Sequence, residues 1–137
     1  MQVEYIKHGG VEVAVVTGTE PVITNAASAL DLTMTVRYET GAERTAIGKS
    51  VITEDFFIFS TGLTGEILQK WISCHIKTAV LGDCSRYTSK PLRNFIYESN
   101  QGKDLFFAET RKEALERLAG ARQRSGTQSE RGAGGET

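Results

Sequence analysis

The residues best suited to chemistry are two adjacent hydroxyls, Ser60 and Thr61, followed by Gly62 and an amphipathic run. We expect them at the N-terminus of a helix, where unpaired backbone N–H groups and the positive end of the helix dipole lie. One hydroxyl there can cap the helix by accepting a hydrogen bond from a backbone N–H. The same groups would favour a phosphate on either oxygen, so a phosphorylation switch is the functional alternative to a plain cap.

A second group of polar residues is expected at the same edge of the protein. These residues follow two predicted strands and comprise Glu54, Asp55, Asp83, Arg86, Tyr87 and Lys90. Ligands of parallel sheets bind outside the carboxyl ends of the strands, so this edge is the candidate binding surface. Arg86 and Lys90 can pair with Asp83, or they can hold an anion beside the helix expected after Ser89. Glu54 and Asp55 could act as paired acids, although solvated loop carboxylates are commoner.

The sequence contains no pattern typical of an enzyme or a metal site. Ser60 lacks the flanking glycines of a nucleophile elbow, and neither His8 nor His75 is expected within reach as its base. The lysine-containing glycine loop of nucleotide hydrolases does not occur. Cys74, His75 and Cys84 lack the paired spacing of zinc ligands. We therefore predict no catalytic residue, no metal and no cofactor, and keep an undiscovered enzyme as the third alternative.

Length and composition favour one domain in a reducing compartment. The chain has 137 residues, 39% of them hydrophobic, with a formal net charge of -1. One core can form, and no charge excess attracts nucleic acid. The apolar runs are far shorter than the roughly 20 residues of a membrane span, and residues 1–5 show no secretion signal. An extended segment at 76–81 would hold Cys74 and Cys84 about 20 Å apart, beyond the ~7 Å reach of a disulfide. We expect a cytoplasmic protein with reduced thiols, no nucleic-acid partner and no membrane insertion.

Hydrophobic periodicity and turn residues predict five strands and four helices. The strands are expected at residues 3–7, 11–16, 45–51, 76–81 and 104–108. The helices are expected at 25–38, at 62–73, from Ser89 to residues 100–102, and from a capping box at 110–113 to a stop at Gly120. The order β-β-α-β-α-β-α-β-α predicts an α/β fold with a mixed five-stranded sheet and covering helices. Residues 1–119 should form one domain, and 120–137 a disordered tail without a large apolar residue.

Two family resemblances add to this prediction. The element order, together with Ser60-Thr61-Gly62-Leu63 at a helix start, resembles the STAS domains of bacterial anti-sigma factor antagonists. That resemblance implies a STAS-like fold and phosphorylation at Thr61, although Phe59 stands where the family usually has an acidic residue. The strings at residues 53–57, 61–70, 87–90, 92–100 and 113–118 are similar to the bacterial domain-of-unknown-function 4180 family. This second resemblance covers residues 11–118 and implies no assigned activity.

These observations predict a non-catalytic regulatory or protein-interaction domain. Its expected partner is a protein that binds the edge formed by residues 53–61 and 83–90. The alternative is a small-molecule or anion sensor that uses the same edge as a pocket. The two differ in whether Phe56, Phe57 and Phe59 face the core or a cavity.

Overall fold

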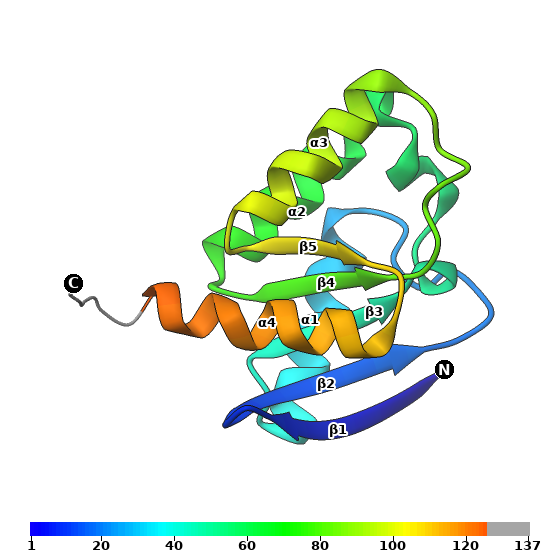
Figure 1. Cartoon of the computed structure of the whole chain (residues 1–137). Helices are drawn as coiled ribbons and strands as arrows, with labels where there is room; N and C mark the ends of the chain where they lie inside the picture. Colours follow the sequence, from blue (N-terminus) through cyan, green and yellow to red (C-terminus); the bar gives the residue numbers. More distant parts are fainter. Residues whose placement is uncertain (126–137) are drawn as a thin grey trace.

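Five strands form one mixed sheet in a computed structural model that describes residues 1–125, and side chains within residues 1–120 (Figure 1). The strands are β1 (Gln2–His8), β2 (Val11–Thr17), β3 (Arg44–Gly48), β4 (Lys77–Leu81) and β5 (Leu105–Ala108). They lie side by side in chain order, with β1 antiparallel to β2 and the remaining neighbours parallel. The predicted α/β fold with a mixed five-stranded sheet is confirmed, whereas the STAS relationship stays a prediction.

Four helices cover the two faces of this sheet. They are α1 (Ala26–Thr40), α2 (Leu63–Ser73), α3 (Lys90–Gln101) and α4 (Arg111–Ser125). Each of the first three joins successive parallel strands, and right-handed crossovers in one direction place all three on the same face. Helix α4 returns across the other face, where it contacts all five strands and lies in front of the sheet in Figure 1.

The core has two halves because successive strand residues point to opposite faces. The half under the first three helices contains Val16, Ile47, Val80, Phe107, Ile67, Trp71 and Leu92. The half under α4 contains Val13, Val15, Ala46, Ala79, Phe106, Leu115 and Leu118. Small residues at the centre of the second half, Ala46 and Ala79, allow one helix to lie close to the sheet. Residues 13–16 are all buried, as the lost polar alternation of that strand predicts.

The buried stripe of α1 differs from the predicted one. Helical spacing over the predicted helix 25–38 favours a stripe of Ala26, Ala29, Leu30, Thr33 and Met34, but Met34 is 43% exposed. The buried residues are Ala29, Leu32, Thr33 and Val36. Both sets satisfy helical spacing because apolar residues occur around much of this helix, so periodicity alone did not determine its orientation.

Two predicted boundaries are wrong. The strand expected at 45–51 ends at Gly48, and three 3₁₀ turns follow it: η1 (Lys49–Val51), η2 (Glu54–Phe57) and η3 (Phe59–Thr61). Helix α4 does not stop at Gly120 but continues to Ser125. Gly120 lacks the positive φ of a terminating glycine, and a helical glycine costs only about 1 kcal/mol relative to alanine. The predicted disorder of residues 126–137 lies outside the described residues. Within the described chain, none of the helices has the length and apolar character required to cross a membrane.

Candidate functional site

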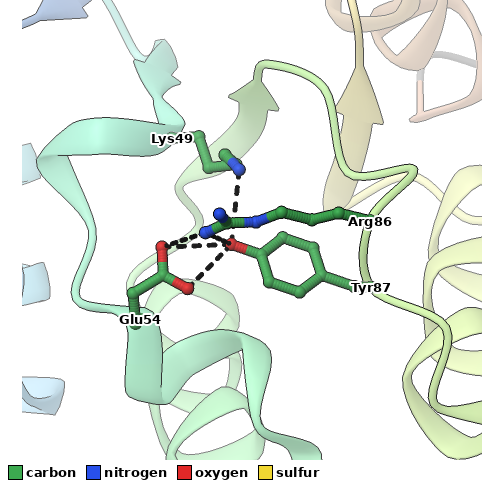
Figure 2. A network of polar contacts seen from close by, with 4 residues as sticks. All are labelled: Lys49, Glu54, Arg86 and Tyr87. Atoms are coloured by element: carbon green, nitrogen blue, oxygen red, sulfur yellow. Dashed lines mark hydrogen bonds and ion pairs between the residues drawn. The ribbon is translucent and has the colours of Figure 1, made fainter.

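Two loops meet at the carboxyl ends of β3 and β4. Figure 2 shows the contact between them, a polar network of Lys49, Glu54, Arg86 and Tyr87. Arg86 Nη2 lies 2.8 Å from Glu54 Oε2 and donates to the Tyr87 hydroxyl at 2.9 Å. That hydroxyl donates to Glu54 Oε1 at 2.9 Å and accepts from Lys49 Nζ at 3.3 Å. The network therefore joins residues more than 30 positions apart in the chain.

An aromatic stack fixes Tyr87 within the network. Its ring lies parallel to that of Phe57, with centroids 4.8 Å apart, and Phe57 meets Phe56 edge-on at 5.1 Å. Phe56 and Phe57 are buried. Lys49 Nζ lies 4.7 Å from the centroid of Tyr87, in cation–π range. The tyrosine is thus anchored to the core at its ring, while its hydroxyl organises the charged groups.

The position of Lys49 depends on a glycine at the end of β4. Gly82 has φ +150°, and a Cβ atom there would lie 2.9 Å from Lys49 Cβ. Both the backbone conformation and this close approach exclude a larger residue without rearrangement. Gly82 therefore allows the lysine stem to cross beside β4 and reach Tyr87.

The charges of this edge compensate one another. The hydrogen bond with Tyr87 and the electrostatic interactions with Tyr87 and with the Glu54 carboxylate raise the pKa of Arg86 above its usual value. Hydrogen bonds from Ser85 lower the pKa of Asp83, with a further contribution from the positive charge of Lys49. Burial raises the pKa of the Cys84 thiol, which outweighs the opposing effect of Lys49. Arg86 and Asp83 are thus held in their charged forms, and Cys84 is held as a thiol rather than a nucleophilic thiolate.

The structure brings together only part of the predicted edge. Glu54, Arg86 and Tyr87 share the network, whereas Asp55, Asp83 and Lys90 lie outside it. Arg86 does not pair with Asp83, which was one of its two alternatives: its partner is Glu54, and Asp83 Oδ1 accepts the backbone N–H of Ser85 at 2.8 Å. Asp55 and Lys90 are exposed.

The predicted contact of a hydroxyl with the start of α2 is present through Thr61, although Thr61 is not the N-cap residue. The N-cap residue is Gly62, with φ +78°, and Ser60 and Thr61 lie before it in η3. Thr61 Oγ1 lies within donating distance of the carbonyls of Ile58 (2.9 Å) and Asp55 (3.1 Å). It also accepts the N–H of Leu63, the first helical residue, at 3.2 Å. Thr61 therefore holds the turn together.

Ser60 differs from its neighbour. It is exposed, and within residues 1–125 its hydroxyl has no hydrogen-bond partner. It lines a shallow groove of about 360 Å³ with five other residues: Phe57, Ile58, Phe59, Ser89 and Pro91. Ile58 is 50% exposed in this groove. Ser60 is thus the free hydroxyl of the pair.

Sequence reasoning missed Lys49 and Thr64. Lys49 was placed inside a predicted strand, so no signal pointed to its role at a loop. Thr64 is buried and its hydroxyl donates to the carbonyl of Phe56, which fixes η2 against α2. Thr64 lies three and seven residues before Ile67 and Trp71, so its spacing placed it on the apolar face of the helix, but nothing in the sequence identified Phe56 as its partner.

The two cysteines do not form a disulfide. Cys74 and Cys84 are free, as the predicted distance between them required. Among the described residues, no group of three or more His, Cys, Asp or Glu side chains could hold a metal ion.

Comparison with known proteins identifies a family. No curated protein and no solved structure matches the chain significantly. The model of one family, described as a domain of unknown function (DUF4180), matches residues 8–118. This match includes α1 to α3, most of α4 and the two loops of the polar network. The chain therefore belongs to the DUF4180 family.

Proposed function

We propose that this protein is a non-catalytic regulatory domain that binds a protein partner through residues 53–61 and 83–90. The observation that carries the proposal is where the loop aromatics Phe56, Phe57 and Phe59 lie. Phe56 and Phe57 are buried in the core and Phe59 packs against it, although Phe57 and Phe59 also border the shallow groove. Ile58, between Phe57 and Phe59, is 50% exposed. The edge thus presents a shallow groove with an exposed apolar residue rather than a deep pocket lined by all three aromatics, and an exposed apolar residue suits a protein interface.

The polar network supports an interface role by holding the two loops in one arrangement. Glu54 and Arg86 have side-chain exposures of 62% and 63%, so their ion pair lies at the surface. Such a pair contributes little stability by itself. Together with the Tyr87–Phe57 stack, it fixes the loops before a partner binds and reduces the entropy lost on binding. A sensor for small anions receives less support, because Glu54 already neutralises Arg86.

We assign the regulation of this surface to phosphorylation of Ser60. A phosphate on Ser60 would add negative charge to the groove beside Ile58 without breaking a hydrogen bond of the fold. The Thr61 hydroxyl is engaged in the turn, so its modification would first disrupt that turn. The proposal includes a cytoplasmic location and no nucleic-acid partner, in keeping with the free cysteines and the balanced charge.

The proposal is tested by affinity capture with three immobilised proteins. Wild type, Ile58→Asp and the control Ile72→Asp are exposed to extract of the native cell, and the retained proteins are quantified by mass spectrometry. Ile72 is 39% exposed on α2 and lines a different groove, so the control introduces the same charge away from the edge. We expect a partner that is retained by wild type and control but lost from Ile58→Asp. Equal retention by all three proteins would contradict the proposed surface.

A further inference from the structure

Strand β1 is an open edge of the sheet. Its only neighbour among the described strands is β2, and in Figure 1 no other element lies beyond it. All seven residues pair with β2 in an unbroken register, without a bulge or a proline. Proteins usually blunt such an edge with a bulge, a proline or a covering element, since unpaired backbone groups attract another strand. The opposite edge strand, β5, has four residues and is flanked by α3.

The turn after β1 determines which backbone groups are unpaired. Gly9 and Gly10 have φ +58° and +79°, as in a type I′ turn. Such a turn is closed by hydrogen bonding between its flanking residues, His8 and Val11. Bonded and non-bonded pairs then alternate along an antiparallel ladder. The N–H and C=O groups of Val3, Tyr5 and Lys7 therefore point outward.

The side chains of β1 divide between the two faces. Glu4 forms an ion pair with Arg111 of α4 at 3.0 Å, and Ile6 packs against the core under α4. Val3 and Tyr5 on the other face are 38% and 48% exposed. The outward backbone groups are thus accompanied by apolar surface that a pairing strand would cover.

We propose that two copies of this chain pair through β1, antiparallel, about a two-fold axis at Tyr5. A symmetric register centred on Glu4 or on Lys7 would place two like charges opposite each other, which is unfavourable. Centring on Ile6 would leave Val3 opposite the turn of the second copy. Centring on Tyr5 overlaps the whole strand, places Val3 opposite Lys7 of the second copy, and pairs every outward backbone group. The strand is thus complementary to itself in one register, and the dimer contains a continuous ten-stranded sheet. This pairing does not depend on the binding surface at the carboxyl edge.

Analytical ultracentrifugation of the full chain tests the proposal. Wild type should sediment with twice the chain mass of 15.0 kDa. Tyr5→Pro removes an outward N–H that β2 does not use, so it should yield a folded monomer, with folding checked by circular dichroism. Tyr5→Thr retains the N–H and a strand-favouring side chain, and should remain dimeric. A monomeric wild type at all concentrations, or a dimeric Tyr5→Pro, would overturn the proposal.

Hydrogen exchange of the wild type locates the contact even where the proline variant fails to fold. The amides of Val3, Tyr5 and Lys7 should be protected at high concentration and lose that protection on dilution. The inward amides of Glu4 and Ile6 should remain protected at both concentrations. A dimer with unprotected outward amides would show that another surface pairs. Protected outward amides in a monomer would show that a different strand occupies the edge. Either of these two results would refute pairing between copies through β1.

Discussion

Replacing Gly82 with alanine tests whether Lys49 reaches the candidate site in the way that the structure describes. Two effects should destabilise Gly82→Ala. The φ of +150° is accessible mainly to glycine, at a cost of about 1–3 kcal/mol for other residues. The new Cβ would also lie 2.9 Å from Lys49 Cβ, and overpacking of this kind costs about 1–3 kcal/mol. The sum, about 2–6 kcal/mol, would be a large part of the total stability of a domain of this size.

Two matched glycines separate these effects. Gly41 has φ +81° but nothing within 4 Å of a new Cβ, so Gly41→Ala should cost only about 1–2 kcal/mol of backbone strain. Gly65 lies inside α2 with open space around it and no positive φ, so Gly65→Ala should stabilise by about 0.5–1 kcal/mol. Chemical denaturation of the variants measures each free energy of unfolding.

A double-mutant cycle with Lys49→Gly isolates the contact itself. Without the lysine Cβ, Gly82→Ala should lose its overpacking cost and retain only its backbone strain, which gives a coupling of about 1–3 kcal/mol. A coupling below about 0.5 kcal/mol would show that Lys49 does not pass beside Gly82. The arrangement of the polar network derived above would then be incorrect, because Lys49 could not lie over Tyr87.

Three further predictions concern single side chains. Thr61→Val should lower the free energy of unfolding, measured by chemical denaturation, by about 0.5–1.5 kcal/mol through loss of the hydrogen bonds of Thr61. Ser60→Ala should change it by less than about 0.5 kcal/mol. Equal effects of the two substitutions would remove the distinction between the two hydroxyls. His75 has φ +58° at the end of α2, so His75→Gly should raise stability by about 1 kcal/mol, and a thermal melt showing a decrease would argue against that backbone conformation. Asp83 has a lowered pKa in the folded protein, so its negative charge stabilises the fold at pH values above its unfolded-state pKa of ~4. This stabilisation is lost as the pH falls through the lower pKa of the folded state. Asp83→Asn should therefore be less stable than wild type at pH 7 and converge with it in acid, and a gap that is independent of pH would contradict the role of the charge.

The fold was predictable because its elements carry independent local signals that agree. Asn25 caps α1 through the N–H of Ser28, and Ser89 caps α3 ahead of Pro91. Thr110 accepts the N–H of Glu113 at the start of α4. Each cap lies directly before a run of residues with helical periodicity, so few arrangements of helices and strands were compatible with all of these local signals.

The candidate site was less predictable because its contacts depend on tertiary structure. Arg86 is three residues from Asp83 and 32 from Glu54, so proximity in sequence favoured the wrong partner. Asp83 is occupied by its local turn with Ser85, and the parallel register of β3 and β4 brings Glu54 into reach. The 3₁₀ turns that carry Lys49 and Glu54 have no long-range periodicity from which they could be recognised.

The two proposed surfaces have a joint consequence for how this protein would bind its partner. The polar network lies at the carboxyl ends of β3 and β4, whereas β1 forms a lateral edge of the same sheet. Occupation of one surface therefore leaves the other accessible. Because the proposed two-fold axis at Tyr5 makes the strands of the two copies antiparallel, their carboxyl edges must face opposite directions. A dimer of this form cannot place both Ile58 residues against one flat partner surface. It can instead bind two partner molecules at once, so one partner per chain, rather than one per dimer, is the stoichiometry that the two proposals require together.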